Sequence, residues 1–197
     1  VWWFLLFWVP AYLSSVYGLD STESWLHVFV VYAISMISVV AAGYFPAYFM
    51  NKKKMDPYQG RMRAMLIFAF FPVLILLAQP LGGISVWIPV IIIGIAAAAH
   101  QSWSANIFST VSDMFPKHAV ATITGIGGMA GGIGALIINK GSGALFDRAQ
   151  ETNMRFMGFE GIESGYFIIF CICAFAYLLG WIIMKSLVPK YKLITNL

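Results

Sequence analysis

Six long runs of apolar residues, separated by shorter polar segments, dominate the chain. The runs cover about residues 1–17, 25–50, 64–78, 85–112, 119–146 and 166–187. A helix needs about 20 mostly apolar residues to cross the hydrocarbon core of a bilayer, so runs of roughly this length predict transmembrane helices. We count six helices and no strands. The pattern predicts an all-α membrane protein, a six-transmembrane-helix bundle.

Prolines, glycines and charged residues mark the expected ends of these runs. Pro116 follows a short polar turn and is an ordinary stop for the fourth helix. The most charged segment, residues 51–63, separates the second run from the third, and a polar stretch at 139–163 precedes the sixth. The chain opens within an apolar run, at Val1-Trp2-Trp3, without an initiator Met or signal-peptide features. We therefore expect a fragment cut on its N-terminal side.

Composition excludes several classes of function. Hydrophobic residues make up 60% of the chain and charged residues 10%, against about 45–50% and about 25% in soluble domains. Six spans leave no room for a soluble domain, which excludes a cytosolic enzyme and a nucleic-acid-binding module. None of the eight acidic residues lies in a predicted membrane core, so we expect no acid–base chemistry there. The three histidines and two cysteines are too scattered for a ligand set, and we expect no metal and no cofactor.

Lysine and arginine are distributed unequally between alternate loops. The second loop, the fourth loop and the C-terminal tail hold nine, and the other three loops hold three. By the positive-inside rule, the first set is cytoplasmic, and both ends of the chain then lie in the cytoplasm. The basic segment 51–63 is explained by this rule, and binding of anionic lipid is the alternative.

The fourth run carries the densest uncharged polarity of the chain, over residues 98–112. Such groups at membrane depth must face protein or water, because lipid offers no hydrogen bonds. At 100° per residue, one face carries Gln101, Ser104, Ala105, Phe108 and Ser112, and roughly the opposite face carries His100, Trp103, Asn106 and Thr110. Amides, hydroxyls and aromatic rings suit a polyhydroxylated solute. The alternative is hydrogen bonding between helices, and His100 is either a proton-coupling group or a neutral, hydrogen-bonded side chain.

Two other runs carry distinctive patterns. Phe4, Trp8 and Tyr12 form an aromatic stripe on the first, which we interpret mainly as packing, with a cavity wall as the alternative. The fifth is rich in glycine, and Gly127 with Gly131 and Gly128 with Gly132 both fit a GxxxG pattern. No strand and no Gly-Lys-Ser sequence accompanies them, so close helix packing explains the glycines better than nucleotide binding.

Taken together, these features resemble the C-terminal half, helices seven to twelve, of a Major Facilitator Superfamily transporter. Within it, residues 2–10, 99–108, 111–116 and 124–131 are similar to bacterial hexuronate transporters of the anion:cation symporter family. The resemblance implies proton-coupled symport of glucuronate or galacturonate across the bacterial inner membrane by alternating access. It also implies that the seventh and tenth helices of that fold line the cavity. The substrate-facing candidates are Trp8, Gln101, Trp103, Ser104, Asn106 and Phe108.

The resemblance also assigns partners. In this family the anion-binding arginine and the proton-titrating acids belong to the N-terminal half, which fits the lack of core Lys and Arg in these spans. The expected partners are therefore the sugar-acid anion, a coupling proton, the N-terminal six-helix half and the lipid bilayer, with no nucleic acid. The loop signature of the superfamily is only loosely echoed by Asp56, Gly60, Arg61 and Arg63. The alternative is a self-sufficient six-helix protein that dimerises through its glycine-rich helix, as a half-size carrier or a scaffold.

Overall fold

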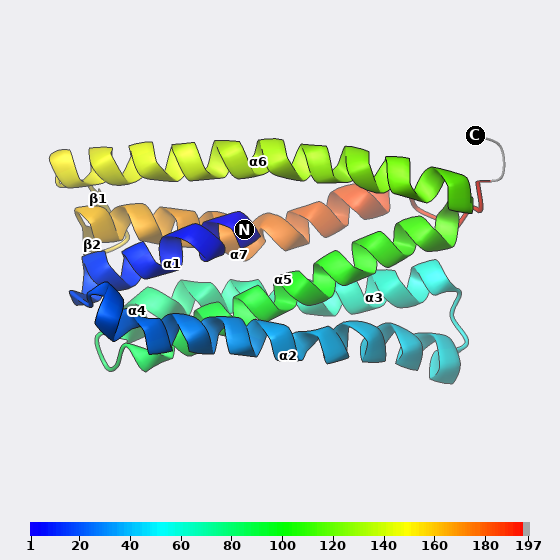
Figure 1. Ribbon diagram of the computed structural model, residues 1–197, viewed down its shortest axis with the longest axis horizontal. Coiled ribbons are helices and arrows are strands. Elements are labelled where there is room, and N and C mark those ends of the chain that lie inside the picture. The colour runs from blue at the N-terminus through cyan, green and yellow to red at the C-terminus, as the bar shows by residue number, and fades with distance from the viewer. Residues whose placement is uncertain (195–197) are drawn as a thin grey trace.

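A computed structural model describes residues 1–194 as six antiparallel helical crossings joined by short connections (Figure 1). The elements are α1 (Trp2–Tyr17), α2 (Ser21–Lys53), α3 (Pro57–Phe70), the 3-10 helix η1 (Phe71–Leu77), α4 (Ala78–Gly82), α5 (Trp87–Met114), α6 (Lys117–Glu151), β1 (Arg155–Phe156), β2 (Phe159–Glu160) and α7 (Ile162–Leu187). The segments α3, η1 and α4 follow one another without a break and form a single crossing. The first, third and fifth connections gather at one end of the bundle, and the second, fourth and the C-terminal tail at the other.

Five of these crossings are long and apolar enough to span a membrane: α2, the stretch 57–82, α5, α6 and α7. The sixth, α1, has 16 residues and belongs to the same bundle. It begins near the middle of the bundle's length and ends beside the start of α2 (Figure 1). The prediction of an all-α bundle of membrane-spanning helices is confirmed.

Local sequence sets where several helices begin and end. Asp20 caps α2 by accepting hydrogen bonds from the backbone N–H groups of Thr22 and Glu23, at 2.7 and 2.9 Å. Glu23 reaches back to the N–H of Asp20 and completes a capping box. Asp56 caps α3 in the same way, and Pro57 occupies its first position, where a missing N–H costs nothing. These caps hold the tight connections that make neighbouring crossings antiparallel.

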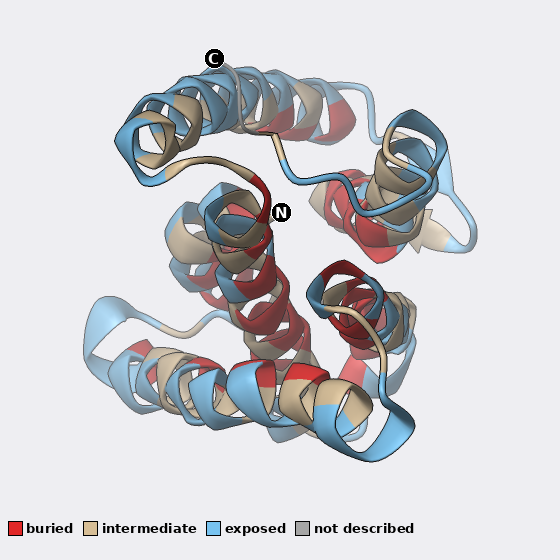
Figure 2. Ribbon diagram, turned by 90° about the vertical axis from the view of Figure 1, so that its right-hand side faces the viewer, coloured by how far each residue is buried: buried red, intermediate tan, exposed pale blue. Residues whose placement is uncertain are grey.

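The core lies where α1, α2, α5 and α7 meet (Figure 2). Tyr12, Tyr166 and Phe170 are each 1% exposed, and the ring of Tyr12 packs edge-on against both of the others. Phe4 and Tyr12 of the predicted aromatic stripe are thus packing residues. Burial of these large rings fixes α1 against α7 and creates a rigid wall at one end of the bundle.

Helix α6 is the least embedded crossing. It lies on the opposite side of the bundle from α2 in both views (Figures 1 and 2), and its only buried residues are Ser142, Phe146 and Ala149. Phe146 packs on Trp8 of α1 and on Tyr166 of α7, with ring centroids 4.9 and 4.2 Å apart. The last third of α6 is therefore anchored, whereas residues 117–138 stand away from the other helices.

Several helices extend beyond the predicted spans. The third crossing is helical over residues 57–82 rather than 64–78, so the charged residues before it belong to the helix. The fifth crossing continues to Glu151, and α7 begins at Ile162 instead of 166. Hydropathy locates the part of a helix that matches the hydrocarbon core, but backbone hydrogen bonding continues into the polar interface.

The prediction that the chain holds no strands is wrong. β1 and β2 form a short antiparallel hairpin in the polar stretch before α7, with Arg155 opposite Glu160. Its turn residues Met157 and Gly158 have φ of 50° and 91°, the positive values that a two-residue hairpin turn requires. A two-residue strand leaves too little alternation to be recognised in the sequence.

Candidate functional site

A cavity of about 700 Å³ lies between α5, α6, α7 and the start of α1. This volume is within the range of small-molecule sites, about 300–1,000 Å³. Four predicted substrate-facing residues line it, together with all four glycines of the GxxxG pairs. These residues are Gln101, Trp103, Ser104, Phe108, Gly127, Gly128, Gly131 and Gly132.

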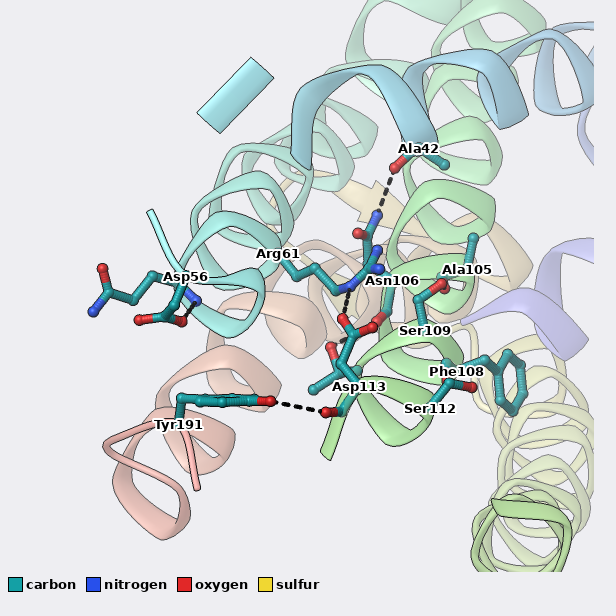
Figure 3. A network of polar contacts seen from close by, with 12 residues as sticks. Ala42, Asp56, Arg61, Ala105, Asn106, Phe108, Ser109, Ser112, Asp113 and Tyr191 are labelled. Atoms are coloured by element: carbon teal, nitrogen blue, oxygen red, sulfur yellow. Dashed lines mark hydrogen bonds and ion pairs between the residues drawn. The ribbon is translucent and has the colours of Figure 1, made fainter. Parts of the chain in front are cut away.

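The side of α5 away from the cavity is tied to α2 by hydrogen bonds. Ser102 Oγ donates to the carbonyl of Ser38 at 3.1 Å. Asn106 Nδ2 donates to the carbonyl of Ala42 at 3.0 Å, as Figure 3 shows. Asn106 is 1% exposed. Among the predicted site residues, Asn106 therefore lies apart from the cavity and serves contact between helices.

Gln101 and Ser104 behave differently from that buried set. Both are half-buried, both line the cavity, and neither side chain makes a hydrogen bond to any residue within 1–194. Trp103 is 6% exposed and lies beside them, and the exposed Phe108 follows one turn later. Free amide and hydroxyl groups next to aromatic rings are the arrangement that a polyhydroxylated solute needs.

His100 and Trp103 also line the cavity, next to Gln101 and Ser104. Of the residues predicted on the opposite face, His100 and Trp103 thus line the cavity as well, whereas Asn106 and Thr110 are buried away from it. The cavity face of α5 is wider than an ideal stripe because α6 stands back and leaves the neighbouring positions uncovered.

A linked set of rings forms the wall of the cavity opposite α6. His100 stacks on Trp2, with ring centroids 5.3 Å apart at 10°, and its Nδ1 lies 2.5 Å from the hydroxyl of Tyr177. Tyr177 packs in turn against Trp103 at 5.3 Å. Sequence analysis identified His100 and Trp103 but missed Trp2 and Tyr177, because nothing in an apolar run indicates which helices become neighbours.

The four glycines do not pack closely on any helix within the described chain. A Cβ atom added to Gly127, Gly128, Gly131 or Gly132 would meet nothing within 4 Å. The predicted close helix packing is therefore not made by residues 1–194, and the glycines instead leave an open, smooth wall facing Gln101 and Ser104.

Trp8, the remaining predicted site residue, lies outside this cavity. It lines a separate hollow with Phe7, Ala11 and Asn139, and its Nε1 donates to Asn139 Oδ1 at 3.0 Å. With Phe146 stacked edge-on against it, Trp8 helps to anchor α6 to α1.

Among the described residues, the side chains that line the cavity include no Lys, Arg, Asp or Glu. The ionisable side chains in its wall are His100, Tyr177 and Cys173. The cavity is thus largely apolar, with a few uncharged polar groups, so a charged solute would need a partner from outside this surface.

A second polar network lies at the far end of α5. Arg61 Nε donates to the carboxylate of Asp113 at 2.6 Å, and the hydroxyl of Tyr191 donates to the Asp113 carbonyl at 3.1 Å (Figure 3). This network joins α3, α5 and the C-terminal tail. It shares no residue with the cavity, so its role is structural.

A bundle of membrane-spanning helices with a solute-sized cavity along one side is an architecture that membrane transporters use. Residues 1–138 match the Major Facilitator Superfamily, and the chain belongs to that superfamily. This match places the chain in a superfamily of multi-pass membrane transporters.

Individual relatives support the same class. The chain is 26% identical over 182 residues to the uncharacterized transporter YybO of Bacillus subtilis (strain 168), which covers 89% of this chain and 39% of that protein. It is 22% identical over 142 residues to the hexuronate transporter of Escherichia coli (strain K12), covering 71% of this chain and 32% of the relative. The chain thus spans two fifths or less of the length of these relatives. No solved structure is significantly similar to it.

Proposed function

We propose that this chain is the C-terminal half of a proton-coupled symporter that carries a hexuronate, such as glucuronate or galacturonate, by alternating access. The observation that carries the proposal is the cavity face of α5, where Gln101 and Ser104 have no hydrogen-bond partner within the described chain and lie beside aromatic rings. The hexuronate transporter among the relatives supports the choice of solute. The proposed location is the bacterial inner membrane, with both ends of the chain cytoplasmic.

In this proposal, Gln101 and Ser104 bind hydroxyl groups of the sugar acid, and Trp103 and Phe108 cover its apolar ring face. An amide offers two donors and one acceptor and a hydroxyl offers one donor, so the two side chains together match several sugar hydroxyls. Trp8 and Asn106 act indirectly, by anchoring α6 and joining α5 to α2.

The carboxylate of the solute requires a positive partner that the cavity wall lacks. We assign this partner to the N-terminal half of the same transporter, which would complete the cavity across the open glycine face of α6 and the exposed face of α2. This assignment explains why apolar side chains such as Val40 on α2 and Met129 on α6 are exposed, at 77% and 69%.

We assign His100 to proton coupling on this half. Its ring is held between Trp2 and the Tyr177 hydroxyl while one edge remains in the cavity wall. A proton taken up by His100 as the carboxylate binds would add one positive charge beside it, in addition to the cation that we assign to the N-terminal half, so that proton and anion bind together. Replacing His100 with Gln is expected to abolish pH-dependent substrate binding, and Tyr177→Phe to shift its pH profile.

The test is glucuronate-driven pH change in proteoliposomes that contain the complete protein carrying this chain. Gln101→Ala is expected to lower uptake at least about tenfold, because it removes contacts to a solute hydroxyl in a desolvated site. The matched control is Asn106→Ala, which should lower thermal stability but keep coupled uptake per folded molecule.

Loss of uptake in Asn106→Ala with full activity in Gln101→Ala would mean that the solute contacts the face of α5 that carries Asn106 and not the face that carries Gln101. Failure of every uronate to drive proton movement would overturn the proposed substrate. In that case the self-sufficient six-helix protein, which dimerises through the glycines of α6, becomes the better hypothesis.

A further inference from the structure

A pocket of about 640 Å³ lies between α3, α7 and the C-terminal tail, away from the cavity just described. It shares no lining residue with that cavity. The pocket opens at the end of the bundle that carries the α2–α3 connection (Figure 1). Its charged lining residues are Arg63, Lys185 and Lys190, with Asp56 as the single acid.

None of the three cations of this pocket forms an ion pair with an acidic side chain within residues 1–194. Arg61, two residues before Arg63, is paired with Asp113, whereas Arg63 and Lys190 form no ion pair with any residue in 1–194. The Asp56 carboxylate accepts the Gln59 N–H at 2.8 Å as the cap of α3. The pocket therefore carries an excess of two positive charges that an anion would neutralise.

On both α3 and α7, the pocket lining changes from basic at the end of the bundle to apolar toward its middle. On α3, Leu66 lies one turn closer to the middle of the bundle than Arg63, and on α7 Trp181 lies one turn closer than Lys185. The indole of Trp181 donates to the carbonyl of Met62 at 2.8 Å, which fixes this aromatic floor. A basic rim above an apolar floor fits a molecule with an anionic head and an apolar tail.

We propose that this pocket binds an anionic phospholipid. Arg63, Lys185 and Lys190 contact its phosphate, and an acyl chain descends along Leu66 and Trp181. Two contacts fix the position of the Lys185 side chain in the pocket. Its ammonium donates to the Pro189 carbonyl at 2.8 Å and lies 5.5 Å from the centroid of the Tyr58 ring. Basic pockets between transmembrane helices recognise lipid headgroups by this combination of charge and depth. The bound lipid joins α7 and the tail to α3.

The test is native mass spectrometry of the complete protein with phosphatidylglycerol, and with phosphatidylcholine as the zwitterionic comparison. The double variant Arg63→Gln/Lys190→Gln is expected to weaken phosphatidylglycerol binding about thirtyfold, since each substitution removes one ion pair with the lipid phosphate, at about 1 kcal/mol each. The matched control is Lys52→Gln/Lys53→Gln, which removes the same charge from the same end outside the pocket and is expected to change binding less than about threefold.

A second arm separates lipid from soluble phosphate. Leu66→Asn should weaken phosphatidylglycerol without changing the binding of glycerol 3-phosphate, because it alters only the floor. An equal loss of phosphatidylglycerol affinity in the Lys52/Lys53 control would overturn the proposal, since it would show that the lipid responds to the overall charge of this end and not to the pocket. Equal binding of phosphatidylcholine, or of glycerol 3-phosphate in place of the lipid, would also overturn it.

Discussion

At the scale of single residues, the function of a polar group in this chain depends on what covers it. Ser102 and Asn106 hydrogen-bond to carbonyls of α2, whereas Gln101 and Ser104, their close neighbours in sequence, face open space. Helical periodicity alone predicted two faces. It could not tell which one lined the cavity, because both carry similar residue types and the answer depends on where α2 and α6 pack.

Asp20 provides a prediction at this scale that pH can test. Hydrogen bonds from the Thr22 hydroxyl, and from the backbone N–H groups of Glu23 and Thr22, lower the pKa of the Asp20 carboxyl, which lies outside the membrane spans. A group whose pKa is lowered by folding stabilises the folded form above its unfolded pKa, and this stabilisation is lost as pH falls through the folded pKa. The first turn of α2 is therefore expected to fray in acid.

Hydrogen exchange of the Thr22 and Glu23 amides, corrected for intrinsic rates, measures this effect. Asp20→Ala should raise their exchange several-fold at neutral pH, because both N–H groups lose the carboxylate that caps them. Asp20→Asn is the control: it keeps the cap but should remove the pH dependence. An acid dependence that persists in Asp20→Asn would contradict the explanation.

At the scale of helices, the six crossings and their order could be predicted from hydropathy, because a bilayer demands long apolar segments. Helix ends could not be predicted as well: caps such as Asp56-Pro57 lie within charged sequence that hydropathy counts as loop. The hydropathy pattern also could not predict which helices pack against one another. The contact of Trp2 and Tyr177 with His100 joins α1, α5 and α7 over large separations in sequence.

Two glycines of neighbouring helices are expected to differ sharply in their tolerance of a methyl group. A Cβ at Gly94 would lie 2.8 Å from Ile34 Cδ1 and 3.2 Å from Ile34 Cβ, at the α2–α5 crossing, whereas a Cβ at Gly131 would meet nothing within 4 Å. Gly94→Ala should destabilise the fold by roughly 1–3 kcal/mol through overpacking. Gly131→Ala should leave stability unchanged or raise it by up to about 1 kcal/mol, because alanine favours helix.

Thermal unfolding of both variants in the same detergent provides the comparison. Equal destabilisation by the two substitutions would mean that α6 packs against another surface through its glycine face. If the N-terminal half provides that surface, Gly131→Ala should also reduce transport by the complete protein.

At the scale of the whole molecule, one end of the bundle is held by contacts that join three segments, α3, α5 and the C-terminal tail. The Arg61–Asp113 pair links α3 to α5, and the tail is added by the Tyr58 hydroxyl, which donates to the Val188 carbonyl, and by the Ile194 N–H, which donates to the Met114 carbonyl at 2.9 Å. The Arg61 and Asp113 side chains are 18% and 26% exposed, so each lies in partly desolvated surroundings.

Removing one member of this pair should cost more than removing both. Arg61→Met alone leaves the Asp113 carboxylate partly buried without its partner, and we expect a loss of roughly 1–3 kcal/mol, between the values for surface and buried pairs. The double variant Arg61→Met/Asp113→Leu should recover part of that loss. A double-mutant cycle on thermal stability, with limited proteolysis of the tail as a second measurement, tests this; strictly additive losses would show that the two charges act independently.

The one-sided attachment of α6 has a consequence for how such a protein can work. Phe146 and its neighbours clamp the helix near one end, and a two-residue turn ties the other end to α5. Residues 117–138, between the clamp and the turn, span about 33 Å, so a bend of about 10° above the clamp displaces the middle of this segment by about 3 Å while the turn keeps the far end beside α5. The aromatic wall on the other helices would stay still during that swing. In the proposed transporter, access to the cavity and selectivity for the solute should therefore respond to separate substitutions, one set near residue 146 and the other on α5.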